Sequence, residues 1–518
     1  MNGAETLVQT LVDSGVKVCF ANPGTSEMHF LGALDSNPDI RCILCLFEGV
    51  VSAAADGYAR MAGTPAATLL HLGPGLANAG ANLHNAMRAA TPMVNIVGDH
   101  ATYHRHLDAP LTSDIEGLAR TWSVWVKSAR DAASVAGDAA EAVRRAQEGA
   151  GGIATLILPA DTAWNPAQEP APPQAVARRP VPGPERIDTI AAVLRRGEPT
   201  LLLLHGDVLS DPSALDNIDR IAQGTGAELL TETSNARVER GAGRVGLDPV
   251  PYPVDDAVRR LKHFKRCILI GSRPPVGFFA YPGKPGKLLP DDCQVHVLAH
   301  PDEDGRAAVA TLAAALGVEG KTPRHVTAEK ARPLPKGKLT SAAIGASLAN
   351  RLPADAIICD EALTTGGPIH AALRTAPAFT QLRLTGGAIG IGLPLAIGAA
   401  VACPERKVVV LQADGSGMYT NQALWTHARE KLDIVTIVLS NRSYAILRHE
   451  LSNVGVVNPG PKALAMTSLG DPDIDWPSLA KGMGVPGGAA KTAEEFDALL
   501  AKAMAQRGPF LIEADLAA

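Results

Sequence analysis

Aromatic residues are scarce in this 518-residue chain, where Phe, Trp and Tyr together make up only 4% of the sequence. The apolar fraction is still 46%, and 50 residues are glycine. Small side chains in such numbers favour closely packed helices and sheets, as in layered α/β domains. A chain of this length is expected to form about two to four domains, each with its own core.

Strong charge and long apolar runs are also lacking. The formal net charge is −5, so the concentrated basic surface that nucleic-acid binding requires is not expected. The longest uncharged apolar stretch, residues 388–403, is interrupted by Gly and Pro and is too short to span a bilayer. Residues 1–18 contain Glu5 and Asp13 and lack a basic start, so no secretory signal is predicted. We therefore expect a protein without nucleic-acid or membrane partners.

Cysteine is limited to seven scattered positions. Cys42 and Cys45 have the spacing of a metal or redox pair, but they lie in the apolar run RCILCLFE and no second pair matches them. We interpret both as buried core thiols. Scattered cysteines of odd number indicate a reducing compartment, so the expected location is the cytoplasm.

Short apolar runs alternate with helical patterns along the chain; residues 41–47, for example, read as a strand and residues 49–61 as a helix. This alternation predicts parallel sheets with helices on both faces. Residues 166–184 are dense in proline and lack apolar periodicity, so they are interpreted as a linker, and residues 321–338 form the next one. The predicted fold is therefore three doubly wound parallel-sheet α/β domains, at residues 1–165, 185–320 and 339–518.

Polar residues end two neighbouring apolar runs in a βαβ pattern of the last predicted domain. Asp414 ends the first run and Asn441 ends the second. Because the carboxyl ends of parallel strands form ligand sites, these side chains are expected to lie together, although Asp-Gly alone is more often a turn. With a backbone carbonyl near Ser443 and the N–H groups of Gly415 and Ser416, the pattern predicts a Mg²⁺–diphosphate site.

Two polar residues end strands in the first predicted domain. Glu48 is either a helix-start residue favoured by the helix dipole or a carboxyl group placed to hydrogen-bond a buried heterocycle. His71 precedes a Gly-Pro-Gly turn at the same sheet edge, where a lone histidine is more often structural. The group His100, His104 and His106 matches no strong zinc pattern and is assigned to solvent or an interface.

Four sequence blocks occur in a specific order along the chain. They read FANPGTSEMHFLGAL and CLFEGVVSAAADGYARMAG in the first predicted domain, and TGGAIGIGLPLAIGAA and ADGSGMYTNQALWTHA in the last. These blocks resemble the thiamine diphosphate (ThDP)-dependent 2-oxo acid decarboxylase and acetohydroxyacid synthase superfamily. Benzoylformate decarboxylases are similar in NPGTSE and SYAILRHE, and acetolactate synthases in LGPGLANAGANLHNA. The resemblance implies a pyrimidine-binding first domain, a central domain and a diphosphate-binding last domain.

The resemblance also implies roles for single residues. Glu48 matches the glutamate that hydrogen-bonds N1′ of the aminopyrimidine, and Ile389 matches the apolar residue that holds the cofactor in a V shape. Thr25 and His71 match the hydroxyl and imidazole that handle the substrate carboxylate and proton transfers. The implied magnesium ligands are Asp414, Asn441 and the Ser443 carbonyl, and the implied diphosphate contacts are Gly415, Ser416 and Thr364. The pocket candidates are Thr25, His71, Phe278, Phe279, Tyr444 and Leu447.

Four positions depart from the pattern of this superfamily. Ala413 stands for the usual first glycine of the diphosphate motif, and Ser440 stands for the first of the usual Asn pair. Phe278 and Phe279 lie about where benzoylformate decarboxylases have a second catalytic histidine, which puts simple aldehyde release in doubt. No segment matches the flavin-binding region of acetohydroxyacid synthases, so FAD is not expected.

The expected function is a ThDP- and Mg²⁺-dependent lyase or carboligase that acts on a small-molecule 2-oxo acid, similar to benzoylformate decarboxylase. The alternatives are an acetolactate synthase-type transferase, a flavin-linked ThDP oxidase and a non-catalytic ThDP-binding subunit. In this superfamily the two halves of the site come from different subunits. The resemblance therefore implies a homodimer at least, and a homotetramer as the expected assembly.

Overall fold

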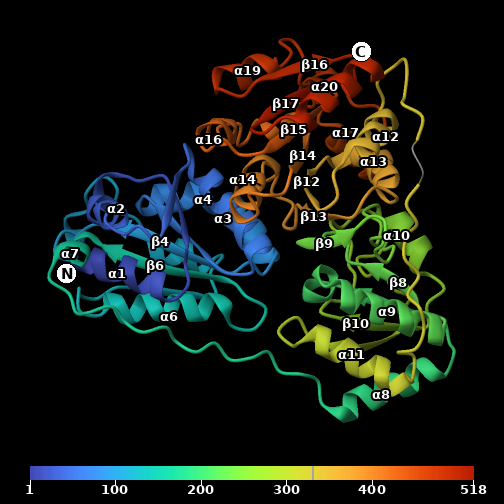
Figure 1. Cartoon of the computed structure of the whole chain (residues 1–518), viewed down its shortest axis with the longest axis horizontal. Helices are drawn as coiled ribbons and strands as arrows, with labels where there is room; N and C mark the ends of the chain where they lie inside the picture. Colours follow the sequence, from blue (N-terminus) through green and yellow to red (C-terminus); the bar gives the residue numbers. More distant parts are fainter. Residues whose placement is uncertain (330–331, 518) are drawn as a thin grey trace.

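The computed structural model describes residues 1–329 and 332–517, which fold into three layered α/β units (Figure 1). Each unit is built on one β-sheet, of six, four and seven strands in chain order. A long segment without regular structure leads from the first unit to α8 (Figure 1). Among the described helices, none has the length and apolar character needed to cross a membrane.

The N-terminal unit has a parallel sheet in the order β2-β1-β3-β4-β6-β5. Its strands are β1 (Val18–Ala21), β2 (Arg41–Leu44), β3 (Ala66–Leu70), β4 (Met93–Asp99), β5 (Trp125–Ser128) and β6 (Ile153–Pro159). One face packs against α3 (Glu48–Ala62), α4 (Leu72–Arg88) and α5 (Ile115–Arg120). The other packs against α1 (Gly3–Asp13), α2 (Met28–Asp35), α6 (Val135–Gln147) and α7 (Ala160–Trp164). The strand order reverses between β1 and β3, so the sheet is doubly wound as predicted.

The central unit has four parallel strands in the order β11-β10-β7-β8. They are β7 (Thr200–Leu204), β8 (Glu228–Thr231), β10 (Arg266–Ile270) and β11 (Gln294–Ala299). Helices α8 (Pro184–Arg195), α9 (Pro212–Thr225) and α11 (Gly305–Leu316) cover one face, and α10 (Val254–Leu261) covers the other. All four strands are parallel, as predicted for this part of the chain.

The C-terminal unit has the order β16-β17-β15-β14-β12-β13-β9. Its strands are β12 (Ala356–Glu361), β13 (Phe379–Arg383), β14 (Val408–Ala413), β15 (Ile434–Ser440), β16 (Gly487–Ala490), β17 (Phe510–Asp515) and β9 (Arg237–Arg240). Its helices are α12 (Ser341–Arg351), α13 (Gly366–Leu373), α14 (Gly392–Ala402), α15 (Asp414–Gly417), α16 (Ala423–Arg429), α17 (Ala445–Asn453), α18 (Pro461–Ala465), α19 (Trp476–Gly482) and α20 (Ala493–Ala505).

Strand β9 corrects the expectation of three wholly parallel sheets. It comes from residues 185–320 but pairs antiparallel with β13, at the edge of the C-terminal sheet. Its sequence RVER is mostly polar and did not predict a strand. An edge strand is buried on fewer sides than a central strand, so it can have few apolar residues. The domain limits drawn from the sequence therefore stay a proposal.

The seven cysteines are all free thiols in the part of the chain that the structure describes. Cys45 is fully buried, as predicted. Cys42 is exposed, so the expectation that it lies in the core is wrong. The reason is that β2 is the outermost strand of its sheet, and its first two residues are open to solvent.

Helices α3 and α14 join the N- and C-terminal units by direct backbone contact. A Cβ built on Gly57 would lie 2.0 Å from the Leu395 carbonyl oxygen, and one on Gly398 would lie 1.9 Å from the Ala54 oxygen. Beside this crossing, Arg60 forms a buried two-bond ion pair with Asp56 at 2.5 and 2.7 Å. The contact fixes the start of α3 relative to the loop before α14.

Candidate functional site

Three predicted residues of the N-terminal unit follow neighbouring parallel strands. Thr25 lies after β1, Glu48 after β2 and His71 after β3, so all three occur at one sheet edge. The strand order reverses between β1 and β3, which is where open α/β sheets form ligand crevices. Thr25 is exposed, whereas Glu48 is only 7% exposed as the first residue of α3.

His71 is held by a buried carboxylate that the sequence did not single out. Its Nδ1 lies 2.9 Å from Glu27 Oε2 and 3.4 Å from Ser26 Oγ. A Cβ on Gly24 would lie 2.0 Å from the same nitrogen, so only glycine fits beside the ring. The carboxylate favours a proton on Nδ1, which leaves Nε2 as the nitrogen that can accept or deliver a proton.

Glu48 is fixed through one of its two oxygens. Its Oε2 accepts a hydrogen bond from Asn78 Nδ2 on α4 at 3.0 Å. A Cβ on Gly75 would lie 3.2 Å from Glu48 Oε1 and 3.3 Å from His71 Cβ, so a glycine separates the two groups. The structure thus brings Glu48 and His71 together across Gly75, as one half of a site.

Asp414 and Asn441 meet at the carboxyl edge of the C-terminal sheet. Asp414 Oδ1 accepts from the Gly415 N–H at 2.8 Å, and its Oδ2 accepts from the N–H groups of Asn441 at 3.1 Å and Arg442 at 2.7 Å. Burial raises the pKa of Asp414, while these three donors act to lower it. Asn441 Oδ1 accepts from the Ser443 N–H at 2.9 Å. Asp414 Oδ1 and Asn441 Oδ1 each accept one of these hydrogen bonds and keep a lone pair for a cation, whereas Asp414 Oδ2 already accepts two.

The loop that carries Ile389 is fastened by a second buried acid. Glu361, at the end of β12, accepts from the Gly390 N–H at 2.6 Å and the Gly392 N–H at 2.7 Å. It also accepts from Gln412 Nε2 at 2.9 Å. Burial raises the pKa of Glu361, and these donors oppose that effect. Glu361 therefore fixes the backbone on both sides of Ile391 and next to Ile389.

The predicted diphosphate contacts surround the start of α15. Gln412 Nε2 donates to Ser416 Oγ at 2.7 Å, and that hydroxyl lies 3.1 Å from the Ala413 carbonyl oxygen. The Ser416 hydroxyl is thus engaged within the chain, and its backbone N–H is the group left for an anion. Gly415 lies under the Tyr444 ring, since a Cβ there would approach it to 2.4 Å. Thr364 is exposed in a short 3₁₀ turn after β12.

The remaining pocket candidates adjoin this half. Phe278 lies against the Ile389 loop, because a Cβ on Gly387 would come within 2.7 Å of its ring. Phe279 packs edge-on against Phe278 with ring centroids 5.0 Å apart. Leu447 is 46% exposed on α17, and Tyr444 precedes that helix. Phe278 and Phe279 thus form an apolar wall beside the loop.

The two halves do not meet within one chain. His71 caps the start of α4, whereas Asn85 in its last turn donates to the Ala388 carbonyl at 2.7 Å. A helix of 17 residues is about 25 Å long, so α4 holds the His71 crevice and the Ile389 loop at opposite ends.

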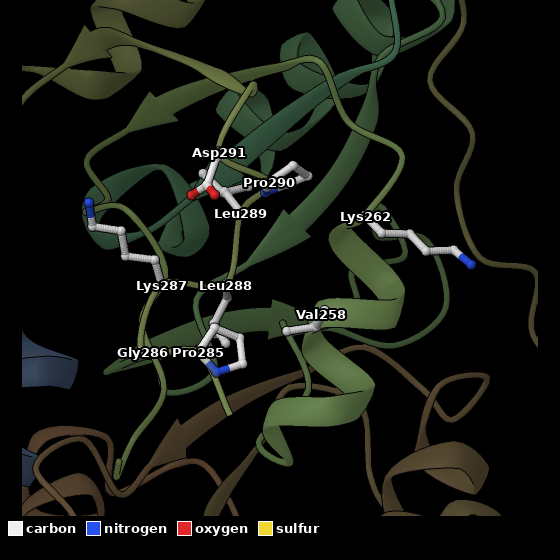
Figure 2. A pocket seen from close by; sticks show the side chains of 9 residues that line it. All are labelled: Val258, Lys262, Pro285, Gly286, Lys287, Leu288, Leu289, Pro290 and Asp291. Carbon is white, nitrogen blue, oxygen red and sulfur yellow. The ribbon is translucent and has the colours of Figure 1, made fainter. Parts of the chain in front are cut away.

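Other candidate centres are less suited to chemistry. No group of three His, Cys, Asp or Glu with metal-binding geometry occurs in residues 1–329 and 332–517, which leaves the His100–His106 cluster without support as a metal site. A cavity of about 480 Å³ lies beside α10 in the central unit (Figure 2). Among its charged side chains, Lys262 lies on the opposite side from Lys287 and Asp291 (Figure 2). Catalytic pockets instead have converging polar groups.

Comparison with known proteins gives separate family matches for the N-terminal and C-terminal units. The model "Thiamine pyrophosphate enzyme, N-terminal TPP binding domain" matches residues 1–119, and "Thiamine pyrophosphate enzyme, C-terminal TPP binding domain" matches residues 370–514. A Mycobacterium tuberculosis protein, provisionally named acetolactate synthase large subunit IlvX, is 50% identical over 99% of this chain and 98% of its own. Benzoylformate decarboxylase of Pseudomonas aeruginosa is 28% identical over 96% of both chains.

A solved structure shares the fold over nearly the whole length. The ThDP-dependent 4-hydroxybenzoylformate decarboxylase of Rhodococcus jostii RHA1 superposes with a TM-score of 0.85, covers 99% of both chains and is 24% identical. At that identity the likeness concerns the fold alone. The relative at 50% identity carries the assignment further, and the chain belongs to the thiamine pyrophosphate enzyme family, with homologues among both decarboxylases and acetolactate synthases.

Proposed function

We propose that this ThDP enzyme cleaves or forms a carbon–carbon bond of a 2-oxo acid with Mg²⁺ as the second cofactor, as a decarboxylase or carboligase similar to benzoylformate decarboxylase. The observation that carries the proposal is the paired architecture of the sheet edges. One edge offers Glu48 beside His71, and the other offers Asp414 and Asn441 below the Ile389 loop.

The donor set suits magnesium and a diphosphate. One buried carboxylate, one amide oxygen and the Ser443 carbonyl leave positions for phosphate oxygens, which is how Mg²⁺ is usually held. Ala413 has an extended backbone with φ of −71°, a conformation open to any residue, so the missing glycine costs nothing there. Ser440 continues β15 as a buried strand residue. These two departures therefore give no support to a non-catalytic subunit.

Each protein group has a distinct role in the proposal. Bound ThDP supplies an electron sink for the pair left behind when CO₂ departs. Glu48 would hydrogen-bond the aminopyrimidine nitrogen of this cofactor, and Ile389 would pack against it. His71, oriented by Glu27, moves a proton at Nε2, while the Thr25 hydroxyl binds the substrate carboxylate. The low exposure of Glu48 keeps water from its hydrogen bond.

The site requires two chains. Within one chain, α4 has the His71 crevice at its start and the Ile389 loop at its end, so we propose that the Glu48 half of one chain faces the Asp414 half of a second. A homodimer is the smallest active unit in this proposal, and we propose a homotetramer of two such dimers, located in the cytoplasm. The free thiols agree with a reducing compartment.

An acetolactate synthase-type transferase is the second candidate. It is favoured by the 50% identical relative and by Phe278 and Phe279, which offer no proton donor for aldehyde release. Product analysis separates the two functions: free aldehyde indicates a lyase, whereas conversion of pyruvate to acetolactate indicates the transferase. We expect the purified protein to be colourless, since a yellow, flavin-containing preparation would indicate an oxidase.

A screen of 2-oxo acids for CO₂ release, with ThDP and Mg²⁺ added, tests the proposal. We expect turnover that Glu48→Gln lowers by about 10² or more, because the amide cannot favour the same tautomer of the aminopyrimidine. Glu405→Gln, an exposed control with the same charge change, should keep the activity. Unchanged turnover in the Glu48 variant would refute the mechanism.

A further inference from the structure

A polar cluster between the central and C-terminal units surrounds Glu450 on α17. Its carboxylate accepts hydrogen bonds from Tyr281 Oη at 2.6 Å and Tyr252 Oη at 3.4 Å. Both tyrosines come from loops that flank α10 or follow β10 in the central unit. Burial, together with the neighbouring Glu450, raises the pKa of both phenols, so they stay protonated donors at neutral pH.

This cluster borders the proposed substrate pocket. Glu450 is three residues after Leu447, so both project from the same face of α17. On the other side, the Tyr252 ring lies 5.5 Å from the Phe278 ring, centroid to centroid. Phe278 in turn touches Gly387, two residues before Ile389. Carboxylate, phenols and phenyl rings therefore form one continuous wall above the Ile389 loop.

The wall carries a negative charge without a counter-ion. Within the described residues, no Lys, Arg or His nitrogen lies within 4.0 Å of the Glu450 carboxylate. Lys284 lies over the Tyr281 ring but is engaged with Asp255 at 2.9 Å. Glu450 is half-buried and ringed by aromatic groups, where like charges repel more strongly than in water.

We propose that Glu450 selects the substrate class, by rejecting 2-oxo acids that carry a second carboxylate and admitting those whose far end is uncharged. This inference rests on the proposed function of the same site. The 2-oxo acid places its own carboxylate at Thr25 and His71, and its far end extends toward the wall of Glu450 and Phe278. A second anion there meets Glu450, whereas an alkyl or aryl end meets the rings.

The test compares 2-oxopentanoate with 2-oxoglutarate, which have equal carbon chains and differ in the terminal carboxylate. We expect wild-type kcat/KM to favour 2-oxopentanoate by about 100-fold, and Glu450→Gln to narrow that ratio by about tenfold or more. Tyr281→Phe keeps the charge of Glu450, so the ratio should stay within about threefold of wild type. Glu405→Gln serves as the remote control for a lost negative charge.

Each outcome decides between the two proposals. A ratio that Glu450→Gln leaves unchanged, or a wild-type preference for 2-oxoglutarate, overturns the selection by Glu450 and leaves the proposed function standing. If neither acid is turned over, calorimetric titration of both acids into the ThDP-loaded protein replaces kinetics. Tighter binding of 2-oxopentanoate than of 2-oxoglutarate, with this preference lost in Glu450→Gln, then supports the selection although the proposed reaction fails. Equal affinity for the two acids, or no binding of either, overturns it.

Discussion

Glu361 fastens the Ile389 loop at the two glycines that follow Ile389 and Ile391. Its two oxygens accept from two backbone N–H groups of the loop, and its side chain is only 1% exposed. In Glu361→Gln, the new NH₂ group would face one of these N–H donors, so the loop must shift. We expect the affinity for ThDP to fall by about tenfold, since hydrogen bonds to charged groups contribute about 1.5–3 kcal/mol. Titration of the apoprotein with ThDP, followed by tryptophan fluorescence, measures this.

A second substitution distinguishes the role of Glu361 in positioning the Ile389 loop from its contribution to the stability of the fold. Gln412→Glu added to Glu361→Gln restores one carboxylate and one amide 2.9 Å apart. The restored pair should recover the melting temperature but not the cofactor affinity, because position 412 lies on β14 and does not accept from Gly390. ThDP affinity equal to wild type in Glu361→Gln would show that the loop does not need this acid.

The sequence predicted some of the site residues and not others, and the reason can be given for each. Asp414 and Asn441 were expected together, and they do lie together, because strand ends in a parallel sheet share one edge. Glu361 ends the apolar run AIICDE, so the same argument could have found it. Its partners could not be predicted, since they depend on the path of a loop about thirty residues further along the chain. The same holds for the contact of Glu450 with Tyr281.

At the scale of elements, the crossing of α3 and α14 aligns the two sheet edges. The helices touch through Gly57 and Gly398, so neither position has room for a Cβ atom. Gly398→Ala would place a methyl group 1.9 Å from the Ala54 carbonyl oxygen and force the helices apart. We expect a loss of about 3 kcal/mol in unfolding free energy, the upper range for an overpacked contact. Thermal denaturation monitored by circular dichroism measures the change.

Gly137 provides the matched control for this substitution. It lies in α6 with open space around its Cβ position, so Gly137→Ala should stabilise the chain by about 0.4–1 kcal/mol through lower unfolded-state entropy. Equal effects of both substitutions would contradict the role of the crossing.

The sequence predicted the elements of the sheets better than their irregular ends. Apolar runs gave the central strands correctly, whereas β9 was missed because its pairing energy comes from an edge contact. Three non-glycine residues with left-handed backbones flank predicted site residues: Leu72 at φ of 47°, Leu363 at 49° and Arg442 at 54°. Only tertiary contacts sustain such strain, for example the 2.9 Å ion pair of Arg442 with Asp515, so no local pattern reveals it.

At the scale of the whole molecule, one chain contains both halves of the site but keeps them apart along α4. Two inactive variants should therefore complement each other. In a mixed dimer of Glu48→Gln and Asp414→Asn chains, one interface combines both lesions and the other combines the intact Glu48 with the intact Asp414. Random mixing of the two chains makes half of the dimers mixed, and one of the two sites in each mixed dimer is intact. About a quarter of all sites should therefore be active.

The experiment co-expresses the two variants with different affinity tags and purifies the doubly tagged species. A doubly tagged dimer should show about half of the wild-type activity, and a doubly tagged tetramer of two randomly formed dimers about 0.3 of it, while each variant alone stays near background. A mixture of two Glu48→Gln chains with different tags is the control for contamination. If the site were assembled within one chain, no mixed species could recover, because every chain carries a lesion. Recovery would thus establish the contribution of both chains independently of the substrate used, and its absence in a stable mixed dimer would refute the two-chain site.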